Sequence, residues 1–142
     1  MTYLDACATI PFYLPEVLSE EVDALIRACK DPFMSNLSAL EVVSVIARKV
    51  REGGMDRADA SAALGLFESH RRALLYEPLE IGARHVVEAE RLIRTLEHPL
   101  KTQDGIHAAA CLLEGHRLVT ADKQLARVAD SLGIPTVYLE AA

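Results

Sequence analysis

The sequence has no tryptophan, and aromatic residues make up only 5% of its 142 residues. Leucine, alanine and valine supply most of the apolar share, a mixture that disfavours a β-sandwich and favours helices packed on a sheet. The three cysteines, Cys7, Cys29 and Cys111, are odd in number and form no CxxC pair. This spacing argues against a disulfide framework or a zinc knuckle and favours a reducing compartment, the cytoplasm.

Long apolar runs are also missing. No segment approaches the roughly 20 apolar residues that a membrane-spanning helix needs. Residues 1–16 contain Asp5 and Pro11 and lack the basic and apolar regions of a signal peptide. No repeat, low-complexity tract or linker divides the chain. We therefore expect one cytoplasmic domain over residues 1–142, with no membrane partner.

The charge balance is acidic, with a formal net charge of −6. A simple nucleic-acid-binding module usually has a basic surface that neutralises phosphates, so this charge argues against such a module. An enzyme that binds phosphates through metal ions is compatible with this net charge, because metal-binding carboxylates make the metal-free protein more acidic than the metal-bound one.

Apolar periodicity and turn residues predict alternating strands and helices. Strands are expected at 2–5, 32–35, 74–79, 117–120 and 134–139, and a short helical segment follows the first strand. Longer helices are expected at 18–29, 38–51, 56–74, 81–97, 103–114 and 122–132, with Ser19 at an N-cap. Two helix faces are expected to be buried: Leu40, Val43, Ala47 and Val50 in the first, and Val86, Val87, Ala89, Leu92, Ile93 and Leu96 in the second.

The last three elements form one strand–helix–strand unit, RLVT, ADKQLARVADSLG and IPTVYL. Strands joined by such a crossover are parallel. Helices alternate with short apolar strands elsewhere too. The predicted fold is therefore α/β, a three-layer α/β/α sandwich with a mostly parallel sheet of four or five strands.

Four acidic residues occupy equivalent places in this predicted topology. Asp5 ends the first strand, Glu41 lies in the first turn of helix 38–51, Asp104 opens helix 103–114, and Asp122 follows strand 117–120. The carboxyl ends of parallel strands and the following helix N-termini share one edge, where ligands bind. The four carboxylates are therefore expected to converge.

Gathered carboxylates need a cation or a proton to offset their repulsion. All-oxygen ligands select Mg²⁺ or Mn²⁺ over zinc. Such ions ionise a water molecule and neutralise charge on a phosphodiester. The sequence thus predicts a metal site formed by Asp5, Glu41, Asp104 and Asp122 that is suited to phosphodiester hydrolysis.

A purely structural interpretation competes with this one. Acidic residues are common in the first turn of helices. The segment from Ser38 to Glu41 fits a capping box, and Asp104 and Asp122 could be ordinary caps. For Glu41, Asp104 and Asp122 taken singly, the structural role is the favoured interpretation. Asp5 is different, because an acid that closes an apolar strand is not expected to cap a helix.

Four segments resemble, in order, the motifs of PIN-domain ribonucleases, most closely the VapC toxins of bacterial toxin–antitoxin pairs: YLDACATIPFYLPE, SNLSALEVVSVIARKVREG, TQDGIHAAACLLEG and LVTADKQLARVADSLGIPTVYL. The resemblance spans Tyr3 to Leu139. It implies a Mg²⁺- or Mn²⁺-dependent endoribonuclease in which the family's acidic residues fall on Asp5, Glu41, Asp104 and Asp122. Thr120 matches a hydroxyl near the metal site. The resemblance also implies a homodimer and a cognate antitoxin that covers the acidic groove.

The chain departs from the family pattern in two places. Ala6-Cys7 follows the first acid where the family often has a Thr-Ser-type pair, and the lost hydroxyl is expected to weaken support for Asp5 or to alter how a phosphate is held. Gln103 and Gly105 flank Asp104 where the family more usually has small or apolar neighbours, and Gly105 in the first turn of the helix costs up to roughly 1 kcal/mol in helix propensity.

Several other residues have two interpretations. The basic clusters Arg48-Lys49-Arg51 and His70-Arg71-Arg72 complement helix C-termini, or one of them guides the RNA backbone. His107 is more readily a packed or surface residue than a site residue, and Cys7 is more readily a small core residue than a reactive thiol. The leading hypothesis is an RNA-cleaving enzyme. The alternative is a catalytically silent scaffold that acts through protein partners, and only the resemblance separates RNA from DNA as the substrate.

Overall fold

Five parallel strands form one sheet in the order β3-β2-β1-β4-β5. The computed structural model describes residues 1–140. The strands are β1 (Thr2–Leu4), β2 (Pro32–Ser35), β3 (Glu77–Leu79), β4 (Arg117–Thr120) and β5 (Thr136–Tyr138). The predicted fold class is confirmed, and the sheet is parallel throughout.

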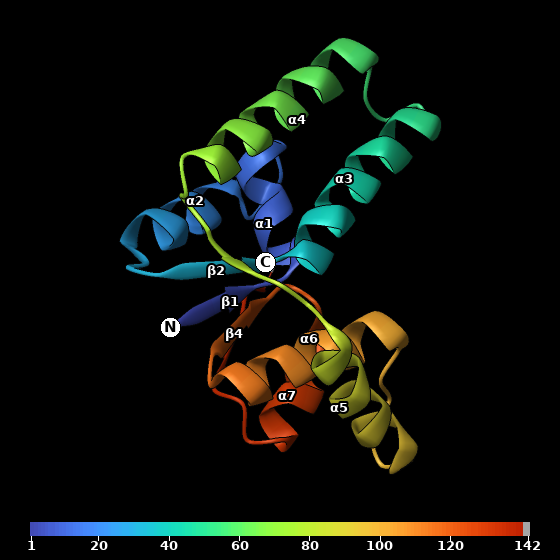
Figure 1. Ribbon diagram of the computed structural model, residues 1–142. Helices are drawn as coiled ribbons and strands as arrows, with labels where there is room; N and C mark the ends of the chain where they lie inside the picture. The colour runs from blue at the N-terminus through green and yellow to red at the C-terminus, as the bar shows by residue number, and fades with distance from the viewer. Residues whose placement is uncertain (141–142) are drawn as a thin grey trace.

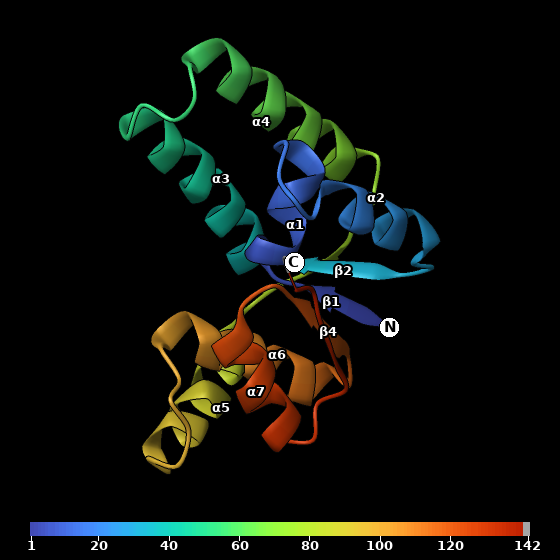
Figure 2. The same ribbon diagram turned by 180° about the vertical axis from the view of Figure 1, so that it is seen from behind.

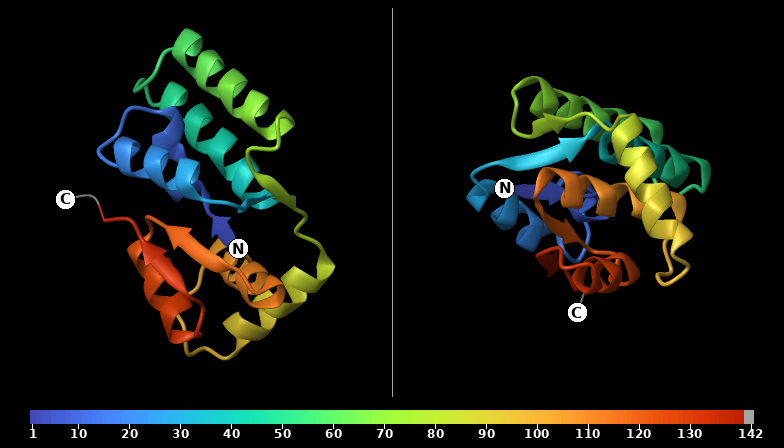
Figure 3. Two further views of the ribbon diagram at one scale, coloured as in Figure 1. Left: turned by 90° about the vertical axis from the view of Figure 1, so that its left-hand side faces the viewer. Right: turned by 60° about the horizontal axis from the view of Figure 1, so that its bottom comes forward.

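Helices cover both faces of this sheet, which gives three layers (Figures 1 and 2). On one face lie α1 (Ala6–Tyr13), α2 (Ser19–Ala28), α3 (Asn36–Arg51) and α4 (Arg57–Arg72), and on the other α5 (Ala83–Arg94), α6 (Thr102–Glu114) and α7 (Lys123–Ser131). Helices α3 and α4 form a hairpin that extends away from the sheet, as Figure 3 also shows. No helix within residues 1–140 is both long enough and apolar enough to cross a membrane.

Each face of the sheet has its own apolar core, because successive strand residues point to opposite faces. Leu4 packs with Ile46 and Phe67 in the core under α1 to α4. Tyr3, its neighbour in β1, lies with Leu118 in the core under α5 to α7. Strand β1 is therefore buried on both sides, as expected for a central parallel strand.

Two helices are followed by glycine residues with positive φ. Gly53 (φ 76°) lies just beyond α3 and Gly115 (φ 70°) just beyond α6, in the left-handed conformation that glycine adopts without strain. The assignment of Ser19 as an N-cap is wrong. Ser19 is the first residue of α2, and its hydroxyl donates to the Leu14 carbonyl oxygen and accepts from the Glu16 amide.

Of the four residues predicted for the inner face of α3, only Val50 packs against the core, and the prediction is wrong for the other three. Leu40 and Val43 are exposed, with 66% and 38% of their surface accessible, whereas Ala39, Val42 and Ile46 are buried. Both sets have helical spacing, so periodicity alone does not separate them. Ala39, Val42 and Ile46 all belong to the core under α1 to α4, and the neighbouring stripe is left toward solvent.

The inner face of α5 also differs in part from the prediction. Ala89 and Leu92 are buried, but Val86, Val87 and Leu96 are exposed. Close packing on α6 explains the choice: a β-carbon built on Gly105 would lie 2.8 Å from Cδ1 of Ile93 and 3.6 Å from Cβ of Ala89. The glycine that weakens helix propensity is the residue that lets α5 and α6 approach.

Candidate functional site

The candidate site lies where the order of strands reverses along the chain. From the central β1 the chain runs to β2 on one side, and it returns to β4 on the other side only after α6. The carboxyl ends of two such neighbouring strands border a crevice in open α/β sheets. Asp5 directly follows β1, and Asp122 follows β4 after one intervening residue.

A cavity of about 300 Å³ opens at this point, and the four predicted acids all line it: Asp5, Glu41, Asp104 and Asp122. The structure therefore brings the four predicted acids to one cavity. They do not converge on a single point, however. Within residues 1–140, no three His, Cys, Asp or Glu side chains are placed so that they could hold one metal ion.

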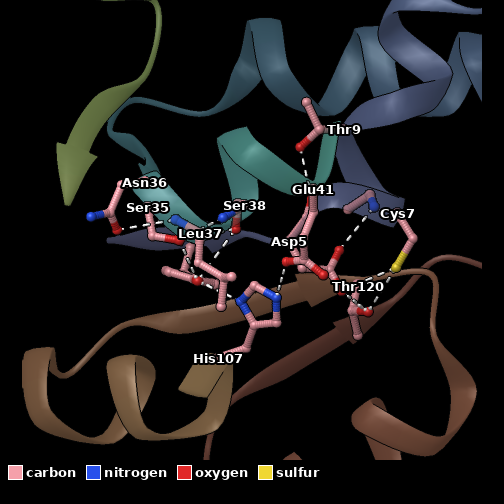
Figure 4. A network of polar contacts seen from close by, with 12 residues as sticks. Asp5, Cys7, Thr9, Ser35, Asn36, Leu37, Ser38, Glu41, His107 and Thr120 are labelled. Atoms are coloured by element: carbon pink, nitrogen blue, oxygen red, sulfur yellow. Dashed lines mark hydrogen bonds and ion pairs between the residues drawn. The ribbon is translucent and has the colours of Figure 1, made fainter. Parts of the chain in front are cut away.

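Asp5 is almost fully buried, with 3% of its surface exposed, and contrary to the prediction it is the N-cap of α1. Its Oδ1 accepts from the Ala8 amide at 2.9 Å. Its Oδ2 accepts hydrogen bonds from the Thr120 hydroxyl and from the Cys7 thiol. Burial raises the pKa of Asp5 against the lowering effect of His107 and of these hydrogen bonds. The carboxylate is thus held rigidly by both of its oxygens (Figure 4).

Thr120 connects the two strand ends. Its side chain is fully buried, and its hydroxyl donates to Asp5 while it accepts the Asp122 backbone amide at 2.9 Å. The hydroxyl therefore fixes the position of Asp5 relative to the start of the segment that carries Asp122. Thr120 therefore lies beside Asp5, and its supporting role at a metal site stays a prediction.

Asp122 is the N-cap of α7, and its Oδ1 accepts from the Leu125 amide at 3.0 Å. Asp122 is therefore a helix cap, as the structural interpretation of this residue expected. The same side chain also lines the cavity, so capping and a functional role are not alternatives at this position.

Asp104 lies in the first turn of α6 without being its N-cap, which is Lys101. Partial burial raises the pKa of Asp104, and the charges of Asp122 and Asp5 raise it further. The charges of His107 and Lys101 act in the opposite direction. Asp104 therefore lies among other carboxylates. A bound cation would stabilise the ionised form of Asp104.

Glu41 is not part of a capping box, because α3 begins earlier than expected. Its N-cap is Ser35, whose hydroxyl accepts from the Ser38 amide at 2.9 Å. Glu41 Oε1 lies 2.6 Å from His107 Nε2 across the cavity wall. The structural explanation offered for Glu41 at the sequence level is thus removed.

His107 is the residue whose place at the site the sequence did not favour. It is 2% exposed, and both ring nitrogens have partners: Nδ1 lies 2.5 Å from the Tyr3 hydroxyl, and Nε2 faces Glu41. Its position three residues after Asp104, one helical turn along, was the available signal. The interpretation as a packed histidine is correct, but the packing is in the wall of the site.

Cys7 is not a core residue. The residue is exposed and lines the cavity, with its sulfur turned toward Asp5 and Thr120 (Figure 4). Its thiol donates to Asp5 Oδ2 at 3.1 Å. The desolvated setting of the sulfur and the charge of Asp5 raise the pKa of the thiol. The thiol thus supplies a hydrogen bond where a hydroxyl was expected to be lost.

The two basic clusters lie at different places. Arg48 and Lys49 line the same cavity as the acids. Arg71 and Arg72 line a separate and larger cavity of about 440 Å³ between α4 and β3. Only the first cluster is therefore positioned to meet a ligand of the carboxylates.

The donor set fits a hard divalent cation in its chemistry. The cavity offers carboxylate oxygens, which Mg²⁺ and Mn²⁺ prefer, and Asp104 shows the mutual repulsion that a cation relieves. Asp5, Asp104 and Asp122 come from the ends of β1 and β4 and the start of α6, so one ion between them would join three segments.

Comparisons with known proteins agree with the geometry. The PIN domain family profile matches residues 2–131. Ribonuclease VapC3 from Pyrobaculum aerophilum is 26% identical over 133 residues, which are 93% of this chain and 97% of that protein. The crystal structure of VapC20 from Mycobacterium tuberculosis, a sarcin–ricin loop cleaving toxin, matches with a TM-score of 0.70 at 16% identity, over 98% of this chain and 100% of that chain. A toxin–antitoxin complex from Klebsiella pneumoniae matches with a TM-score of 0.63 at 19% identity, over 99% of both chains.

Proposed function

The chain belongs to the PIN-domain family, and from this premise we propose that it is a Mg²⁺- or Mn²⁺-dependent endoribonuclease, the toxin of a toxin–antitoxin pair in the cytoplasm. The observation that carries the proposal is the cavity that all four acids line at the boundary between β1 and β4. The relative Ribonuclease VapC3, by its name, supports RNA as the substrate.

In this proposal Asp5, Asp104 and Asp122 hold the metal and Glu41 completes the set. A bound divalent ion supplies a more acidic water molecule and neutralises charge on the phosphodiester. The protein contributes the orientation. Asp5 is held by the Ala8 amide and by Thr120, so its oxygens keep their direction before any ligand arrives.

Arg48 and Lys49 are proposed to bind the RNA backbone next to the acids. They lie near the end of α3, and Lys49 is 3.7 Å from Glu16 in a half-exposed ion pair that costs little to exchange for a phosphate. The chain as a whole is acidic, so local cations of this kind are needed to admit a polyanion to the cavity.

Asp122→Asn tests the catalytic proposal with little disturbance of the fold, since asparagine caps helices about as well as aspartate. The variant is expected to lose Mg²⁺-dependent cleavage of RNA while its circular dichroism spectrum and melting temperature stay close to wild type. Asp56→Asn is the matched control: Asp56 caps α4 in the same way, accepting from the Asp59 amide at 2.8 Å, but is exposed outside the cavity. Cleavage retained in both Asp122→Asn and Asp5→Asn refutes the proposal.

One observation favours the rival scaffold function, namely that no three candidate ligands within residues 1–140 are placed to hold one ion. A thermal titration with Mn²⁺ separates the two. An enzyme whose side chains turn onto the ion gains about 1.4 kcal/mol of stability at ten times the dissociation constant. A silent scaffold shows no shift in its melting temperature, and neither does an Asp104→Asn variant of the enzyme.

We further propose that the protein forms a homodimer and is held inactive by a cognate antitoxin. The toxin–antitoxin complex from Klebsiella pneumoniae supports the second partner. The exposed Leu40 and Val43 on α3 supply an apolar surface for the first. Sedimentation of wild type and of Leu40→Glu measures this: a dimer that dissociates in the variant supports it, and a monomeric wild type contradicts it.

A further inference from the structure

A buried chain of hydrogen bonds runs from the start of α3 to Glu41 (Figure 4). The Ser35 and Tyr3 hydroxyl oxygens are 2.8 Å apart, and the Ser38 hydroxyl donates to that of Tyr3 at 3.3 Å. Tyr3 then meets Nδ1 of His107 at 2.5 Å, and His107 Nε2 meets Glu41 Oε1 at 2.6 Å. Every member except Glu41 is buried, and Glu41 is at the cavity wall.

Glu41 fixes the direction of the hydrogen bond at one end of this hydrogen-bond chain. A carboxylate only accepts, so His107 Nε2 carries the hydrogen that Glu41 receives. In the tautomer with hydrogen on Nε2 alone, Nδ1 accepts from the Tyr3 hydroxyl. Burial raises the pKa of Tyr3 above its ordinary value of 10.0, which keeps that hydrogen in place. The Tyr3 oxygen receives its own hydrogen bond from Ser38 or Ser35, so every buried side chain of this hydrogen-bond network has a partner.

We propose that His107 is a positioning residue: its Nε2–H holds the Glu41 carboxylate at the cavity before any metal arrives, and the Tyr3 hydroxyl orients the imidazole ring through Nδ1. The consequence for metal binding rests on the proposed function. The hydrogen-bond chain itself is a property of the metal-free protein.

The hydrogen bond between His107 and Glu41 joins two helices that lie on opposite sides of the site. Glu41 is on α3 and Asp104 is on α6, and these helices cover opposite faces of the sheet (Figure 1). The Glu41 side chain is 30% exposed, so without a partner it samples several rotamers. The bond from His107, one turn beyond Asp104 on α6, fixes Glu41 relative to the acids on the other side of the cavity.

The two ring nitrogens are tested separately by two amides of different length. His107→Gln places an amide group near the position of Nε2 and can still donate to Glu41. His107→Asn reaches only the position of Nδ1 and can meet Tyr3 but not Glu41. Both variants place a polar amide at the same buried position. If His107 had only a structural role, the two variants would therefore have the same Mn²⁺ affinity. Mn²⁺ affinity is measured by thermal titration, together with metal-free melting.

The expected result is that His107→Gln keeps the Mn²⁺ affinity of the wild type, whereas His107→Asn weakens it roughly 10- to 100-fold, the range for lost outer hydrogen bonds to metal ligands. Equal affinity in the two folded variants overturns the positioning role. If the wild type binds no Mn²⁺, the proposed function fails, and the inference is then judged on the metal-free protein alone.

The inference is tested on the metal-free protein by ¹⁵N nuclear magnetic resonance of the His107 imidazole in EDTA. We expect hydrogen on Nε2 in the wild type, and a change in the Nε2 signal in Glu41→Gln. Tyr3→Phe is expected to change the Nδ1 signal and to leave the hydrogen on Nε2, with the fold retained because Ser35 also donates to Ser38. A wild-type His107 with no hydrogen on Nε2 overturns the inference.

Discussion

Asp5 both caps α1 and lines the cavity, and two substitutions separate these roles. In Asp5→Ala the cap is lost, at a cost of about 1 kcal/mol, and the fully buried Thr120 hydroxyl loses its acceptor, at roughly 1–3 kcal/mol. In Asp5→Asn the carbonyl oxygen still accepts from the Ala8 amide. We therefore expect Asp5→Ala to be less stable than Asp5→Asn by about 2 kcal/mol, which is roughly 6–8 °C in melting temperature for a chain of this length.

The pH dependence of the metal-free protein gives a second, sharper measure of Asp5. Burial raises its pKa in the folded state above the ordinary value of 3.8. The folded protein thus binds more protons than the unfolded chain, so the contribution of Asp5 to stability is complete below pH 3.8 and is lost as the pH rises through the raised pKa. Asp5→Asn does not titrate, so its stability relative to wild type is expected to increase over this range.

Urea denaturation in EDTA at a series of pH values from about 4 to 7 measures both quantities, with wild type and Asp5→Asn compared at each pH so that other titrating groups cancel. If wild type gains stability relative to Asp5→Asn as the pH rises, the hydrogen bonds from Thr120 and Cys7 outweigh burial and the reasoning is refuted. Equal stabilities of Asp5→Asn and Asp5→Ala would refute the capping role.

Three further outcomes are expected. Gly105→Val should lower the free energy of unfolding by about 1–3 kcal/mol, because its β-carbon would meet a side chain of α5 at 2.8 Å; unchanged urea unfolding would contradict this close packing. Ile46→Ala should cost about 2–5 kcal/mol while Val43→Ala, measured at concentrations where the protein is monomeric, should cost less than about 0.5 kcal/mol; the reverse order would restore the face of α3 predicted from the sequence. Arg48→Ala and Lys49→Ala should each reduce the slope of log RNA affinity against log salt by about 1, and unchanged slopes would remove these residues from the RNA-binding surface.

The sequence predicted the fold and the meeting place of the acids because both depend on order along the chain. Asp5 and Asp122 follow strands, and parallel strands end at one edge whatever their side chains do. The strand–helix–strand unit at the end of the chain had one possible pairing, which the parallel register of Val119 with Val137 confirms.

What the sequence did not settle depends on distances of a few ångströms between helices. Apolar residues occupy two adjoining stripes of α3 with the same helical spacing, and packing against the neighbouring elements decides which stripe meets the core. The N-cap of α3 is Ser35 rather than Ser38, and this removes the capping box of Glu41. Its true partner, His107, is 66 residues away, a separation at which local patterns give no information.

The central claim is that the four carboxylates are a metal site and not merely neighbours, and a crystal structure of the protein soaked in Mn²⁺ tests it most directly. We predict anomalous scattering from Mn²⁺ in the cavity between β1 and β4, within coordination distance of oxygens of Asp5, Asp104 and Asp122, with Glu41 turned toward it. Soaked crystals with no anomalous peak in this cavity, or with Mn²⁺ only at sites elsewhere on the surface, would contradict the account.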